Sequence, residues 1–283
     1  MCGRYALAGD WADFVSHFNL SALRDESGQV IGADRMRLQP RYNIAPSAQG
    51  GFEVPVLRSS GLQSARFWYI PHWWSQPLNR LPTAFNAKSE ELSDKPFFRG
   101  AEKVLVPLSG WREFSGPAGK KRAFAFERGA SAAGKGRFFA LAGIGSPFVD
   151  PVTQEPGFSF SILTTQASNW LSPYHHRMPL LVPRADYDAW RDPKVLLPEL
   201  LPSAQAESQR AHEVGQVDQL SVYECSTLGN HTKTQGPECI WSLERVLKDP
   251  QLSTHLQERS KAPRKKKARA PASEKQQSLF GDD

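Results

Sequence analysis

The chain has 283 residues, of which 40% are hydrophobic, and this is enough for a substantial buried core in one large domain or two small ones. A formal net charge of +6 permits a polyanionic partner. No run of about 18 apolar residues occurs, and no basic segment precedes an apolar one near the start, so we expect neither a membrane span nor a secretory signal. The three cysteines lack the paired spacing of a zinc site, which favours a reduced, cytoplasmic protein.

The first chemically unusual feature is Cys2, which follows the initiator methionine. Removal of Met1 would leave a cysteine whose free α-amine and thiol lie on adjacent carbons. The amine titrates near about pH 8 and the thiol near about 8.5, so modest tuning makes both groups nucleophilic at neutral pH. Together they can condense with an aldehyde, first to an imine and then to a thiazolidine ring.

Hydrophobic patterning predicts a β-rich body with few short helices. Apolar residues recur at helical spacing over 11–18, after Asp10, a residue suited to an N-cap. Short runs rich in aromatic and β-branched residues predict strands. These strands are expected at 54–57, 65–70, 103–107, 124–126, 137–142 and 158–163.

The second half of the chain predicts one more short helix, at 185–190, and surface loops at 145–157 and 201–216. From about residue 251 the composition changes to Lys, Arg, Ala, Pro, Ser and Gln, which cannot bury enough apolar surface to offset the entropy of ordering. We therefore predict a single α+β domain over residues 2–250, followed by a disordered basic tail over 251–283.

Five separated motifs carry the chemically useful side chains. They are Cys-Gly-Arg-Tyr at 2–5, Pro-Arg-Tyr-Asn-Ile-Ala-Pro at 40–46, Phe-Asn-Ala-Lys-Ser-Glu at 85–90, Val-Pro-Leu-Ser-Gly-Trp-Arg-Glu-Phe at 106–114 and His-His-Arg-Met-Pro at 175–179. In this order they resemble the SRAP (SOS response-associated peptidase) family, whose members crosslink to abasic sites in single-stranded DNA. The resemblance runs from Cys2 to about Trp190, is weaker to about Leu243 and excludes the tail. It implies that Cys2 forms a thiazolidine on the ring-opened aldehyde of an abasic deoxyribose and shields that lesion.

Three further side chains match family positions that serve this chemistry. Glu113 matches the acidic residue, and a carboxyl group desolvated beside aromatic rings can have a raised pKa and move protons during imine formation. Asn86 can hold the cysteine amine or the sugar hydroxyl, although a turn residue is the alternative. His175 matches the histidine expected to protonate the sugar ring oxygen. His176 occupies a position where the family more often has aspartate, so the choice within the doublet stays open.

Binding of single-stranded DNA requires cations for phosphates and aromatic faces for bases. The predicted DNA-binding residues are Arg4, Trp73, Trp74, Lys88, Arg99 and Arg177. The sequence departs from the family at Lys88, where arginine is usual and a bidentate phosphate clamp becomes a point charge. It departs again at 68–73, where a Trp-Gly-x-x-Pro-x-Trp stretch is one residue short, and Gly229-Asn230 only loosely resembles a late asparagine motif. These departures bear on DNA affinity more than on crosslinking.

The tail contains two signals. A basic run at 264–269 is typical of a solvated segment and can add salt-sensitive attraction to phosphates. Residues 276–280 read Gln-Gln-Ser-Leu-Phe and resemble the bacterial sliding-clamp-binding pentapeptide, with a chance match as the alternative. Gln276, Leu279 and Phe280 would be its anchors on a disordered tether.

The sequence therefore predicts a cytoplasmic, nucleoid-associated monomer that crosslinks to abasic sites in a lyase-like reaction and binds a sliding clamp through its tail. No metal or organic cofactor is implied. Two other functions use the same residues. One is non-covalent binding of single-stranded or modified DNA, and the other is an N-terminal-nucleophile peptidase that cleaves at least its own Met1.

Overall fold

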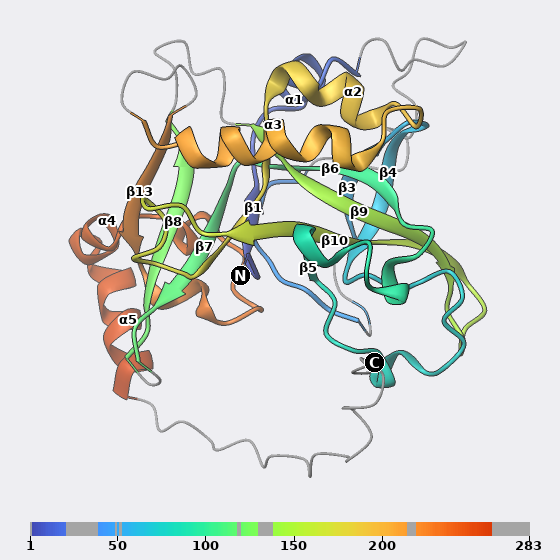
Figure 1. The fold of residues 1–283 in the computed structure, drawn as a ribbon. Coiled ribbons are helices and arrows are strands. Elements are labelled where there is room, and N and C mark those ends of the chain that lie inside the picture. Colours follow the sequence, from blue (N-terminus) through green and yellow to red (C-terminus); the bar gives the residue numbers. More distant parts are fainter. Residues whose placement is uncertain are drawn as a thin grey trace.

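The computed structural model describes residues 2–20, 39–48, 50, 53–117, 120–129, 138–213 and 219–261. Within these ranges, two β-sheets form the centre of the molecule and short helices lie around them (Figure 1). This confirms the predicted α+β class, with a β-rich body and few short helices. Among the described residues, no helix is long and apolar enough to cross a bilayer.

Five strands close into a barrel, in the order β10-β4-β3-β6-β9 and back to β10. Their bounds are β3 Glu53–Arg58, β4 Gly61–Phe67, β6 Glu102–Leu108, β9 Phe139–Val149 and β10 Pro156–Gln166. β3, β6 and β10 contain the runs predicted at 54–57, 103–107 and 158–163. β4 overlaps the run predicted at 65–70 only up to Phe67, and β9 overlaps the run predicted at 137–142 from Phe139. β10 closes the barrel because it pairs with β9 antiparallel, Phe160 opposite Gly145, and with β4 in parallel on its other edge.

Three short strands extend the barrel where the candidate motifs lie. β5, Asn86–Lys88, runs parallel to β10, and β11, Arg177–Pro179, runs antiparallel to it. β12, Leu181–Val182, pairs with β9. The motifs at 86–90 and 175–179 therefore both lie beside the C-terminal half of β10.

The second sheet has the strand order β13-β8-β7-β1-β2. Its bounds are β1 Tyr5–Leu7, β2 Arg41–Ile44, β7 Gly110–Ser115, β8 Arg122–Arg128 and β13 Leu220–Cys225. The chain passes from β6 of the barrel directly into β7 through Ser109. The backbone N–H of Ser109 donates to the carbonyl of Ala6 at 2.8 Å, which holds the connection against β1.

The two sheets share one aromatic core. Tyr5 of β1 meets Phe67 of β4 edge to face, with ring centroids 5.5 Å apart, and Phe67 stacks on Phe160 at 5.1 Å. Trp111 of β7 stacks on Phe126 of β8 at 4.7 Å. These rings are almost wholly buried, and aromatic side chains of this size contribute much of the apolar area removed from water. The site therefore rests on a rigid, packed base.

The predicted helix at 11–18 is confirmed. α1 spans Trp11–His17, and the Asp10 carboxylate accepts from the backbone N–H of Ala12 at 2.7 Å. The second expected helix is also present, as the 3-10 turn Arg184–Asp186 followed by α2, Tyr187–Arg191.

The predicted loop over 201–216 is wrong up to residue 210, because α3 spans Leu197–Arg210. Its polar composition and an internal proline conceal a narrow buried stripe of Leu200, Ala204 and Ser208. The hydroxyl of Ser208 is buried with both of its hydrogen bonds made. Its Oγ accepts from the backbone N–H of Leu181 at 2.8 Å and donates to the carbonyl of Ala204 at 2.7 Å. A polar helix is thus held to the barrel through β12.

Two other segments are more regular than predicted. The loop expected at 145–157 is a hairpin in which β9 runs to Val149 and β10 begins at Pro156, with Asp150 accepting turn N–H bonds. The prediction of disorder from residue 251 is wrong for residues 251–261, because α5 spans Pro250–Lys261. This helix follows α4, which spans Leu243–Lys248. Asp249 caps α5 by accepting from two backbone N–H groups of its first turn. The basic run and the pentapeptide lie outside the described residues.

Candidate functional site

Cys2 belongs to the main hydrophobic core, three residues before β1 begins. The residue is 0% exposed. The amide nitrogen Nδ2 of Asn86 donates to the carbonyl oxygen of Cys2 at 3.4 Å. Since Asn86 begins β5 and lies opposite Ile162 of β10, the barrel itself positions this amide.

The Asn86 side chain has a second polar atom at this place. Its Oδ1 is buried, and no hydrogen-bond partner for it occurs in the described part of the chain. A buried acceptor without a partner is costly, so it favours an incoming donor such as an amine or a sugar hydroxyl.

Glu113 lies in β7, two residues after Trp111 and therefore on the same face of the sheet. It is 1% exposed. Burial raises the pKa of its carboxyl group to about 7, although the positive charge of the chain's amino terminus lowers it in part. The Cys2 thiol pKa is raised well above its usual value, first by burial and then by the charge of Glu113. The two groups are therefore electrostatically coupled, and the thiol needs a base before it can react at neutral pH.

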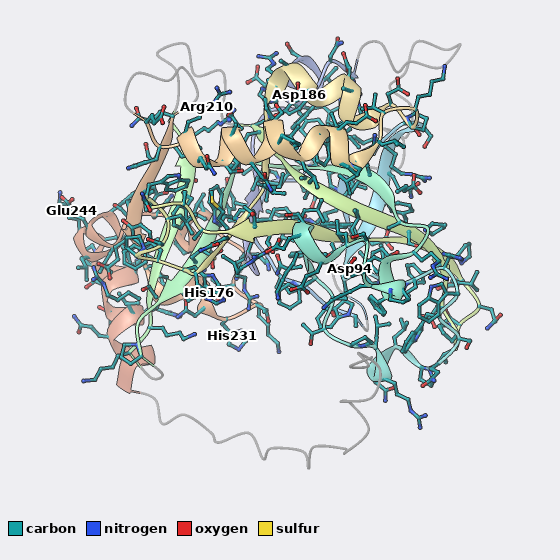
Figure 2. The ribbon with its side chains drawn as sticks, viewed as in Figure 1. Asp94, His176, Asp186, Arg210, His231 and Glu244 are labelled. Atoms are coloured by element: carbon teal, nitrogen blue, oxygen red, sulfur yellow. The ribbon has the colours of Figure 1, made fainter. Side chains whose placement is uncertain are left out.

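His175 and His176 stack with ring centroids 4.4 Å apart, His176 being exposed and His175 half-buried. Figure 2 shows His176 below the ribbons of the central sheets, far from Asp186 and Arg210. Nδ1 of His175 lies 3.0 Å from the backbone nitrogen of Arg177 and 3.1 Å from the carbonyl oxygen of Arg177, so it can accept from the first or donate to the second, according to the tautomer of the ring.

The environment of His175 shifts the pKa of its ring away from neutrality in the DNA-free protein. Burial lowers the pKa of His175 to about 4, and positive charge on the amino terminus, His176 and Lys121 adds to this shift, against a backbone hydrogen bond to Arg177 that raises it. The ring of His175 is therefore neutral at pH 7 in the DNA-free protein. Phosphates brought by DNA would oppose these positive charges and raise the pKa.

Two of the predicted phosphate ligands are engaged by carboxylates. Arg177 forms a bidentate ion pair with Glu90, and its Nη2 also donates to the carbonyl of Thr164 at 2.7 Å. The Arg177 hydrogen bond lowers the pKa of Glu90 to about 2. Lys88 forms an ion pair with one carboxylate oxygen of Glu91. A phosphate that binds Arg177 or Lys88 must therefore replace a carboxylate.

The other predicted DNA ligands are distributed around the site. Arg4 is partly buried, and its Nη1 donates to the carbonyl of Gly3 at 2.7 Å. Arg99 is exposed after the 3-10 turn Pro96–Phe98. Trp73 is 49% exposed and can offer a ring face to a base, whereas Trp74 is packed into a small cluster apart from the main core.

Arg112 is a structural residue of the site that sequence reasoning missed. Although it is 1% exposed, its Nη2 donates to the carbonyl of Ser226 at 3.0 Å and to Oδ1 of Asn230 at 3.2 Å. A Cβ on Gly229 would lie 2.1 Å from Nη1 of Arg112, so glycine makes room for this guanidinium. The Gly229-Asn230 motif thus receives the buried arginine between Trp111 and Glu113. Its only sequence signal is an arginine at an alternating position within an apolar strand.

A cavity of about 620 Å³ lies elsewhere, on the second sheet beside α4. Tyr42, Glu127 and Trp241 line it, but Cys2 and Glu113 do not. No group of three metal-ligating side chains occurs within the described ranges. The candidate site is therefore defined by its side chains and not by this cavity.

The fold and the site define a class of protein in which a barrel and a sheet bury an N-terminal cysteine beside an asparagine and a glutamate. The family model for SOS response associated peptidase (SRAP) matches residues 1–225 of the 283. The chain therefore belongs to the SRAP family, as the five motifs predict.

The names of sequence relatives agree with this assignment. The chain is similar to the abasic site processing protein YoqW of Bacillus subtilis, with 25% identity over 86% of this chain and 100% of that protein. It is also similar to the abasic site processing protein HMCES of Gallus gallus, with 24% identity over 86% of this chain and 78% of that protein. The fold resembles a crystal structure of a Bacteroides thetaiotaomicron protein, with a TM-score of 0.65, 18% identity and coverage of 85% of this chain and 99% of that one.

Proposed function

We propose that this protein recognises abasic sites in single-stranded DNA and shields them through a covalent thiazolidine on Cys2, formed after Met1 is removed. The observation that carries the proposal is the buried Cys2, whose carbonyl oxygen is held by Asn86 and whose thiol is coupled to Glu113. The relatives named as abasic site processing proteins support the choice of lesion.

The site residues support a stepwise condensation. Nε2–H of His175 gives a proton to the sugar ring oxygen, and the proton of the C1′ hydroxyl replaces it as the ring opens to the C1′ aldehyde. The free amine of Cys2 then attacks that carbon, and Glu113 transfers one amine proton to the aldehyde oxygen and a second to the resulting hydroxyl, which leaves as water. The thiol adds to the resulting imine carbon, while its proton passes through Glu113 to the imine nitrogen. The net change is one aldehyde plus one cysteine, giving one thiazolidine and one water.

A denaturing gel tests the proposal with pure protein and matched oligonucleotides, one with an abasic site and one undamaged. We expect a shifted, denaturant-resistant band with the abasic oligonucleotide alone. Retarded mobility on a native gel without a denaturant-resistant band would instead select a non-covalent DNA binder. If no adduct forms and mass spectrometry shows that the protein cleaves peptides after methionine, the N-terminal-nucleophile peptidase is selected.

We further propose that the tail binds a bacterial sliding clamp and thereby delivers the protein to single-stranded gaps. Short peptides depend on a few anchors, so Gln276, Leu279 and Phe280 should contribute most of this binding. The tether raises the local concentration near DNA, and clamp binding need not be tight.

Replacing both Leu279 and Phe280 with alanine should remove clamp association and leave crosslinking to free oligonucleotides unchanged. Calorimetry of a tail peptide with purified bacterial clamp measures the first effect, and the denaturing gel measures the second. Equal binding by the wild-type and doubly substituted peptides, or no binding by either, would contradict the clamp proposal.

A further inference from the structure

The hairpin between β7 and β8 places two lysines beside the candidate site. Its strands pair up to Ser115 opposite Arg122, and the chain turns between them. Lys120 and Lys121 lie at the end of this turn and are exposed. The backbone N–H of Lys120 donates to the carbonyl of Pro117 at 3.0 Å, which closes the turn.

The hairpin is attached to the segment that ends in His175. Ser115 Oγ donates to the carbonyl of Pro173 at 3.3 Å, and the rings of Phe124 and Tyr174 lie 4.7 Å apart. These contacts come from both strands of the hairpin, so they fix its position relative to residues 173–175. The positive charge of Lys121 contributes to the lowered pKa of His175, as expected for a cation close to this ring.

The cationic side chains near the site fall into two groups, those that form an ion pair with a carboxylate and those that do not. Each cation of one group is in an ion pair: Lys88 and Lys95 with Glu91, Arg122 with Glu224, and Arg177 with Glu90. Lys120 and Lys121 form no ion pair with any residue that the structure describes. A phosphate can therefore reach these two lysines without displacing a carboxylate.

We propose that Lys120 and Lys121 form a phosphate-binding site for the DNA strand next to the abasic nucleotide. The inference rests on the proposed function in taking single-stranded DNA as the ligand. Lysine suits this role, because a flexible, solvated ammonium group can follow a mobile backbone without fixed geometry. The hairpin brings the charge to the same loop that carries the proton donor.

A phosphate at this site also changes the chemistry of His175. It offsets the positive charge of Lys121 and so weakens one of the effects that lower the pKa of His175. Occupation of the hairpin by DNA thus favours protonation of the ring when substrate is present.

The test is a double substitution, Lys120→Gln with Lys121→Gln, measured with an undamaged single-stranded oligonucleotide over a range of salt concentrations. The plot of log binding constant against log salt should lose about 0.7 in slope for each phosphate contact removed. Lys194→Gln is the matched control, because Lys194 is exposed, forms no ion pair among the described residues and follows α2, on the opposite side of the molecule from His176 (Figures 1 and 2). It should leave the slope unchanged.

Charge reversal with Lys120→Glu and Lys121→Glu should weaken binding of the undamaged oligonucleotide further. In the DNA-free protein, Lys121→Gln should raise the pKa of His175, which NMR measures. The inference is overturned if the glutamine pair keeps the wild-type slope, or if Lys194→Gln lowers it equally. These outcomes concern binding to undamaged DNA. Failure of the proposed function is seen separately, as the absence of any denaturant-resistant adduct with abasic DNA by the wild-type protein.

Discussion

Cys2→Ala and Cys2→Ser abolish the denaturant-resistant adduct with abasic DNA, because ring closure needs a free amine and a thiol on the same residue. An uncleaved N-terminal tag has the same effect with Cys2 intact, since the backbone nitrogen of Cys2 is then part of an amide. The denaturing gel measures both losses, and mass spectrometry confirms the state of the N-terminus.

Cys225→Ser is the matched control for the loss of a buried thiol. Cys225 is also buried and free, and its Sγ accepts from Nε of Arg112 at 3.4 Å, a bond that a serine hydroxyl can replace. This variant should crosslink like the wild type. Undiminished crosslinking by Cys2→Ala would refute the thiazolidine mechanism.

Glu113→Gln slows crosslink formation by roughly 10²–10⁴-fold, the usual contribution of a general acid–base group. The carboxylate form is the base in both proton transfers, and the pKa of about 7 means that this form becomes populated as the pH rises through neutrality. The wild-type rate should therefore fall as the pH drops below about 7, and the variant should lose this dependence on Glu113. Single-turnover rates between about pH 5.5 and 8.5 measure it.

Stability provides the control for Glu113→Gln. Because burial raises the carboxyl pKa above 4.5, the protonated form stabilises the native state below that value, and this contribution is lost as the pH rises through about 7. The neutral amide avoids this loss, so the variant should be at least as stable as the wild type near pH 8. A slow variant with a much lower melting temperature would indicate unfolding instead of lost proton transfer.

His175→Ala should slow formation or reversal of the crosslink by roughly 10²–10⁴-fold, because the proton donor to the sugar ring oxygen is removed. His176→Ala is the comparison within the stacked pair. Binding to undamaged strands should change little in either variant. A large effect for His176→Ala with none for His175→Ala would reverse the assignment of the proton donor.

The sequence allowed all five barrel strands and α1 to be predicted, because apolar runs and a helical repeat depend on local composition. It did not predict β7, where the charged residues Arg112 and Glu113 are adjacent between Trp111 and Phe114 and point to opposite faces of the strand. Arg112 is buried where a later segment, 226–230, accepts its hydrogen bonds, and Glu113 is buried close enough to Cys2 to raise the pKa of its thiol. α3 was missed for a related reason. One residue of its buried face, Ser208, is polar and makes hydrogen bonds there, so the sequence does not show a continuous apolar stripe.

The reacting groups follow from the sequence alone, because a free amine and thiol on Cys2 are a matter of covalent structure once Met1 leaves. Their reactivity was decided by the tertiary structure. The pKa values of Glu113 and His175 depend on desolvation and on charges from distant segments. Folding likewise pairs Arg177 with Glu90 and leaves Lys121 facing solvent beside His175. Electrostatic energies depend on distance and burial, and only the folded chain sets these for residues far apart in sequence.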